Sequence, residues 1–117
     1  MTMIESMVAL LTAGGTLAGN RVFPLTAPDL TVRPYVIFQR VNTNDENILL
    51  GGSGLSNTRM QLDCYADTYS AVVALSTQID TLLNGWVIQS ISLGAQDLYE
   101  VDVKLYRTQS DYSIWHT

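Results

Sequence analysis

The stretch from Thr58 to Gly85 constrains the fold most, because its apolar residues change their spacing part-way along. Met60, Leu62 and Cys64 alternate with polar neighbours, and this period of two predicts a strand with one buried face. Beyond Ala66 the spacing becomes helical. The predicted helix has one apolar stripe, formed by Tyr69, Val72, Leu75 or Ser76, Ile79 and Leu82/Leu83.

Both ends of this helix carry recognisable signals. We expect Asp67 to be the N-cap, because its carboxylate can accept the free N–H groups and its charge suits the positive end of the helix dipole. Asn84 and Gly85 mark the end, since glycine can take the left-handed conformation that closes a helix. A strand followed by a long helix predicts an α+β domain whose other elements cover or extend this unit.

The N-terminal residues predict a second helix. Thr2 and Glu5 have the spacing of a capping box, in which each side chain binds the other residue's backbone N–H. Apolar residues continue at helical spacing to Leu11, and Gly14-Gly15 ends the pattern. We expect this helix to lie beside the first one on the same face of the sheet.

Between residues 16 and 34 lie all three prolines of the chain. Arg21 to Phe23 can form a short extended piece, but Pro24 cannot donate a hydrogen bond to a sheet. We therefore expect a strap along one edge of the domain. Tyr35 to Val41 follows as a strand rich in β-branched and aromatic residues.

The C-terminal third predicts two further strands. The first runs from Trp86 to Leu93, and Gly94 to Asp97 are expected to turn the chain. The second runs from Leu98 to Thr117, with a bulge or a change of face over the polar residues Thr108 to Ser113. The predicted order is α-β-β-α-β-β: a two-layer α+β fold with a four-stranded, mainly antiparallel sheet and both helices on one face.

The polar interval from Asn42 to Asn57 has two interpretations. As a long loop it would be functional, mobile in the free subunit and ordered on assembly. Its apolar triplet Ile48-Leu49-Leu50 would then form a partner surface. As an extension of the two flanking strands past a glycine bulge, it would have no separate role.

Length and charge limit the kinds of protein that the chain can be. At 117 residues it is expected to form a single domain over residues 1–117. No apolar run is long enough to cross a bilayer, and the N-terminus lacks the positive residues of a secretory signal, so a soluble intracellular domain is expected. The net charge of −5 disfavours direct binding of nucleic acid. The single Cys64 fits a small buried hydrophobe.

No pattern predicts catalysis, a cofactor or a metal site. The single histidine, His116, is close to the C-terminus, and no G-x-S-x-G motif marks a nucleophile. Gly51 to Gly54 lacks the lysine of a phosphate-binding loop, and a strand follows it. Asp45 and Glu46 lack the spacing of a calcium loop.

Aromatic residues suggest self-association instead. The chain has six tyrosines and two tryptophans, and Tyr65 is out of phase with the buried side of its strand. Tyrosine and tryptophan are enriched at protein interfaces. A two-layer domain leaves one sheet face uncovered, and copies of the same chain can cover it.

Several pieces in order along the chain resemble the tail completion (tail terminator) proteins of long-tailed bacteriophages and prophages. They are the leading helix, Arg21 to Pro24, Pro34 to Val36, Asp63 to Ala66 with Tyr69, Leu105 to Arg107, and Ile114 to His116. The segment from Gly94 to Val103 does not follow the pattern.

The resemblance implies a non-enzymatic virion subunit that forms a ring, typically a homohexamer, at the head-proximal end of the tail. Such a ring caps the tail tube protein, stops its polymerisation and presents a surface to the head–tail connector, after assembly in the host cytoplasm. DNA would pass through without specific binding, and no membrane is involved. A neck protein, or another non-enzymatic intracellular binding module, is the alternative.

These expectations single out interface residues. Six copies of the chain carry about thirty negative charges, so acidic residues such as Asp45 and Glu46 would repel passing DNA if they line the bore. The predicted contacts between subunits or to the tube are formed by Arg40, Asp45, Glu46, Ile48, Leu49, Leu50, Arg59, Tyr65 and Arg107.

Overall fold

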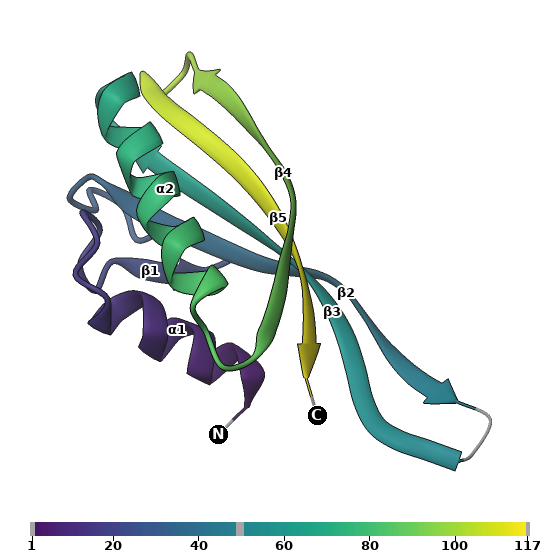
Figure 1. Cartoon of the computed structure of the whole chain (residues 1–117). Coiled ribbons are helices and arrows are strands. Elements are labelled where there is room, and N and C mark those ends of the chain that lie inside the picture. The colour runs from purple at the N-terminus through teal and green to yellow at the C-terminus, as the bar shows by residue number, and fades with distance from the viewer. Residues whose placement is uncertain (1, 49–50, 117) are drawn as a thin grey trace.

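Two helices cover one face of a twisted five-stranded sheet (Figure 1). The structure, a computed structural model, describes residues 2–48 and 51–116, and for residues 44–48 and 51–55 it describes the backbone alone. The sheet order is β1-β2-β3-β5-β4. The elements are α1 (Met3–Ala13), β1 (Val22–Pro24), β2 (Tyr35–Ile48), β3 (Gly51–Ala66), α2 (Tyr69–Asn84), β4 (Gln89–Glu100) and β5 (Leu105–His116).

The α+β class and the two helices are as predicted, but the four-stranded sheet is wrong. Residues of the expected strap form β1, which pairs in parallel with β2 from Val22↔Val36 to Pro24↔Phe38. The other neighbouring pairs are antiparallel, so the sheet is mixed. Pro24 is tolerated because it is the last residue of an edge strand, where its missing N–H group does not interrupt the hydrogen bonds between strands.

The predicted capping box of α1 is confirmed. Thr2 and Glu5 exchange two hydrogen bonds of 3.1 Å each, from each backbone N–H to the other side chain. Gly14 is the C-cap, and a side chain there would collide with Leu82 of α2, because an added Cβ would lie 2.3 Å from its Cδ1. The two helices therefore approach closely at this glycine.

The predicted N-cap of α2 is wrong by one residue. Thr68 is the cap, and its hydroxyl accepts a 3.2 Å hydrogen bond from the N–H of Ala71. The Asp67 carboxylate is instead 2.7 Å from Arg33, which it binds as an ion pair. Gly85 does end the helix, but its φ of −92° is not left-handed. Its N–H simply continues the helical pattern to the carbonyl of Thr81.

The core lies between the helices and one face of the sheet, as the spacing predicted. The strand residues Met60, Leu62 and Cys64 are at most 1% exposed. The stripe of α2 is buried at Val72, Leu75, Ile79 and Leu83, whereas Tyr69 at its start remains 52% exposed. Burial of the Cys64 thiol raises its pKa to about 12.

The interval from Asn42 to Asn57 extends the two flanking strands, and the long-loop interpretation is wrong. Strand β2 continues to Ile48 and β3 begins at Gly51, with register shifts between Arg40 and Asn42 and between Asp45 and Asn47. The first shift is on β2 at Val41. The second leaves Glu46 of β2 opposite residues 53–55 of β3, so the predicted irregularity at the glycines is confirmed. The hairpin projects from the body of the molecule (Figure 1), whose extents are 51 × 26 × 23 Å. Leu49 and Leu50 lie outside the described residues.

The turn between the last two strands was also misplaced. Gly94 lies within β4, with a φ of +131° at a bulge between Ser92 and Gly94. The chain turns at residues 101–104, where Val101 and Val103 are exposed. The two β-branched valines favoured a strand in the sequence pattern, and the glycine favoured a turn.

The predicted irregularity over Thr108 to Ser113 is wrong as well. This part of β5 pairs with β3 in unbroken register, and the buried positions include Thr108 and Ser110. A buried hydroxyl is acceptable when it is hydrogen-bonded, and that of Thr108 donates to Asp97 at 2.8 Å.

Candidate assembly surfaces

The face of the sheet opposite the helices is lined largely by polar and aromatic side chains. We call it the open face, and it includes Tyr35, Gln61, Asp63, Tyr65, Arg107, Gln109 and Asp111. Each of these residues alternates with the helix-facing positions of its strand, and Asp63 is buried on this face too. The prediction that Tyr65 lies on this face is confirmed, and Tyr35 stacks on it with ring centroids 5.1 Å apart.

Arg107 contacts two carboxylates and one aromatic ring on the open face. Its guanidinium lies 3.2 Å from Asp63 and 2.9 Å from Glu100, and its central carbon is 5.8 Å from the centroid of the Tyr65 ring. The Asp63 side chain is only 9% exposed, so the arginine neutralises a carboxylate that has little water around it. Partial burial raises the pKa of Tyr65.

The other two predicted interface arginines differ from Arg107 and from each other. Arg59 lies further along the open face and binds Asp111 at 2.9 Å, with half of its side chain exposed. Arg40 lies on the helix side of β2, beside a hollow of about 440 Å³ that Ile4 and Leu25 also line. Within the described residues Arg40 has no ion pair. Whether these arginines contact a neighbouring subunit stays a prediction.

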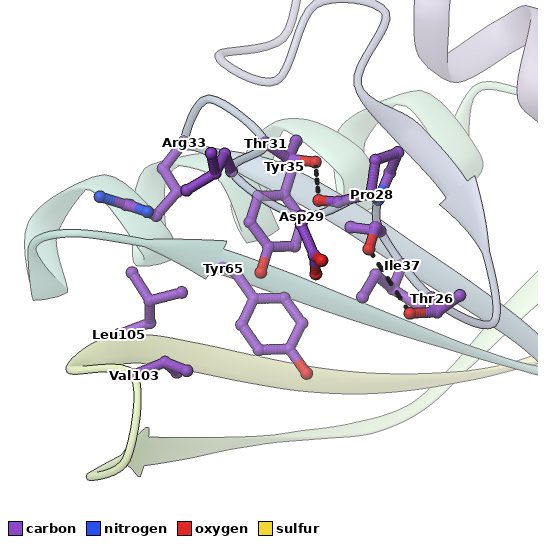
Figure 2. A pocket seen from close by; sticks show the side chains of 12 residues that line it. Thr26, Pro28, Asp29, Thr31, Arg33, Tyr35, Ile37, Tyr65, Val103 and Leu105 are labelled. Carbon is purple, nitrogen blue, oxygen red and sulfur yellow. Dashed lines mark hydrogen bonds between the residues drawn. The ribbon is translucent and has the colours of Figure 1, made fainter.

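Only part of the expected strap is a loop, from Leu25 to Pro34, and from here on strap means these residues. The strap crosses one end of the open face. Beneath it lies a pocket of about 310 Å³ whose lining includes Tyr35, Tyr65 and Leu105 (Figure 2). The strap is fixed at its end by the ion pair between Arg33 and Asp67. At its tip Leu30 is 99% exposed. The sequence did not predict this crossing of the sheet face.

His116 has a structural contact. Its Nε2 is 2.7 Å from the Thr58 hydroxyl, which in turn is 2.9 Å from the hydroxyl of Thr43. Thr58 is 1% exposed, so a substrate could not reach this hydroxyl. Over residues 2–48 and 51–116, no group of three or more His, Cys, Asp or Glu could hold a metal ion. In the same residues no helix is long and apolar enough to cross a membrane.

Two more features bear on assembly. The sheet ends at β4 on one side, and on the other side β1 covers only three residues of the much longer β2. The backbone at Asp45, Glu46 and Ile48 lies in the projecting part of the hairpin (Figure 1), away from the sheet positions of Tyr65 and Arg107. Sequence reasoning missed the bare edge of β4, although the absence of charge from Gln89 to Gln96 was a visible signal.

An open sheet face, bare sheet edges and a projecting hairpin are the features of a subunit that assembles. The model of the family described as "Tail completion protein gp17" matches residues 5–117, and the chain belongs to this family. It is therefore a structural phage tail protein.

Comparison with solved structures supports the fold. A chain in a structure described as the virion of a native gene transfer agent particle is similar, with a TM-score of 0.65 and 13% sequence identity. The similarity covers 93% of this chain and 82% of the other. At this identity the likeness concerns the fold alone. No curated protein matches.

Proposed function

We propose that this protein forms a ring, most simply a homohexamer, at the head-proximal end of the phage tail tube. The ring stops polymerisation of the tube and offers its other side to the head–tail connector. Membership of the tail completion family supports this function. Its site of action is then the neck region of the virion tail, after assembly in the host cytoplasm.

The observation that carries the proposal is the outer part of the β2–β3 hairpin, residues 45–48 and 51–55, which we call the arm. Strand β5 ends its pairing with β3 at Ser56↔His116, and β1 ends its pairing with β2 at Phe38. The arm is thus a ribbon of two strands. An isolated two-stranded ribbon is marginally stable in water, so contact with another protein is the natural way to hold it. The tube and the neighbouring subunit are the partners in this proposal.

Shortening the arm tests this proposal. Replacing residues 46–55 by Asn-Gly joins the paired residues Asp45 and Ser56 with a two-residue turn and leaves the core untouched. The variant should unfold at nearly the same temperature as the wild type but fail to cap tail tubes. In a polymerisation assay, wild-type protein should limit tube length and the variant should not. Leu30→Ser on the exposed strap tip is the control. Equal capping by the wild type and the shortened variant would refute the role of the arm.

The bore hypothesis needs a separate experiment. Reversing Asp45 and Glu46 to lysine should slow DNA passage and lower infectivity if these residues line the channel. Reversing the exposed Asp29 and Asp102 changes the charge equally elsewhere and is the control. Equal infectivity of both double variants would exclude Asp45 and Glu46 from the bore.

A neck or head–tail joining protein is the second candidate, since an assembling subunit with bare edges suits that position too. The purified protein should bind isolated tails and not portal rings if it is the terminator. Imaging by negative stain, together with native mass spectrometry, would establish whether a closed ring forms and with how many copies.

A further inference from the structure

Strand β4 has an unusually unguarded outer edge. It is the last strand of the sheet, so its outward N–H and C=O groups have no partner strand among residues 2–48 and 51–116 (Figure 1). Edge strands are commonly protected from pairing by lysine and other charged residues, by proline, or by a bulge such as the one at Leu93. From Gln89 to Gln96 this strand has neither a charge nor a proline.

The acidic residues further along β4 do not protect it, because both are engaged within the molecule. Asp97 accepts hydrogen bonds from Thr108 at 2.8 Å and from Tyr69 at 2.7 Å. Glu100 binds Arg107. The bulge near Leu93 is the irregular part of the edge, and it presents an apolar side chain that is 52% exposed.

The opposite side of the sheet has a second bare edge. Strand β1 pairs with β2 only as far as Phe38, so the outer edge of β2 is uncovered from Gln39 onwards within the described residues. A register shift between Arg40 and Asn42 places a bulge at Val41, whose side chain is 47% exposed. The two bare edges therefore lie on opposite sides of one sheet, and each has a bulge with an apolar side chain about half exposed.

We propose that β4 of one copy pairs with the outer edge of β2 in the next copy, so that the sheets continue around the ring. This inference rests on the proposed ring. Pairing of two different edges is a head-to-tail contact, which repeats and closes by rotation. Pairing of β4 with β4 would instead leave the β2 edge bare in every copy. Because residues 89–96 of β4 are uncharged, pairing with β2 places no second positive charge beside the exposed Arg40.

Cysteine cross-linking distinguishes these arrangements. Leu93→Cys and Val41→Cys place thiols on the two edges, and a short bismaleimide tolerates a register shift of a residue or two. The native Cys64 is buried, so wild-type protein should not react. A mixture of the two variants should give covalent dimers, and neither variant alone should. Val87→Cys, 97% exposed just before β4, replaces Leu93→Cys in the control mixture and should give none.

The double variant extends the test. A chain that carries both new cysteines should give a ladder of linked copies that ends at the number of subunits in the ring. Cross-linking of Leu93→Cys alone would overturn the head-to-tail pairing in favour of β4 with β4. Rings that form without cross-links between the two edges would overturn the pairing but leave the proposed function standing. A protein that forms no ring, alone or on tail tubes, would refute both.

Discussion

Alternate residues of β3 serve two faces that are stabilised differently. Towards the helices, Leu62 and Cys64 are almost completely buried among apolar side chains. Towards the open face, Asp63 and Arg59 form ion pairs with β5; Asp63 is buried beside its partner, whereas Arg59 is half exposed. The comparison indicates that apolar burial on one face supplies most of the stability. Polar pairs on the other fix the strand register and leave surface for assembly.

The largest effect should come from the helix side. Leu62→Ala removes a fully buried side chain, and such changes cost about 2–5 kcal/mol because a cavity remains. Urea denaturation measures the free energy of unfolding. Val87→Ala, at a 97% exposed position, should change it by less than about 0.5 kcal/mol. Similar losses in the two variants would mean that burial at Leu62 is not a main source of the stability.

On the open face, Arg107→Met should destabilise the protein by about 1.5–3 kcal/mol, the usual contribution of hydrogen bonds to charged groups. The reason is that Asp63, with a side chain only 9% exposed, would lose its partner. Denaturation of Asp63→Asn/Arg107→Met beside the single variants gives the coupling energy. A coupling near zero would mean that the ion pair does not stabilise the fold.

Alkaline pH tests the helix side again. The pKa of Cys64 rises from 9.0 to about 12 on burial, so the folded state keeps a proton that the unfolded chain loses. The contribution of this thiol to the free energy of unfolding is therefore fully present below pH 9. It is lost as the pH rises towards 12, by at most about 1.4 kcal/mol per pH unit. Denaturation of Cys64→Ala should show a flatter profile between pH 9 and 10. Parallel profiles would contradict this assignment.

Arg59→Ala should have the smallest effect, between about 0 and 1 kcal/mol, because its ion pair with Asp111 is half exposed. The result should also depend on salt, since exposed charge pairs are screened. If Arg59 contacts a neighbouring subunit, this variant will weaken the ring far more than it weakens the fold. Sedimentation and urea denaturation of the same samples would separate the two effects.

Local patterns predicted the helices, the central strands and the buried face of β3, because each depends on spacing within one segment. The capping box at Thr2 and Glu5 is an example. The errors arose where distant residues decide. The neighbouring Thr68 is the cap, and the Asp67 carboxylate binds Arg33, which is far away in sequence. Likewise Val101 and Val103 form a turn, since the pairing of β4 with β5 sets where the chain reverses.

The candidate site was less predictable than the fold. The phase of Tyr65 indicated the open face correctly, but its partners come from β2 and β5 and could not be read from spacing. The strap and the bare edges depend on the order of strands in the sheet. That order places β1 beside β2 and β5 between β3 and β4, and no local pattern predicts either placement.

The parallel pairing of β1 with β2 has one more consequence. Two neighbouring parallel strands cannot be joined by a tight hairpin, so the connecting chain must travel back across one side of the sheet. Helix α1 packs against β1 on the helix side, and the strap crosses the open face. The N-terminal third of the chain therefore covers the paired strands β1 and β2 from both faces of the sheet. Deleting α1 and the strap would therefore expose both the core and the open face.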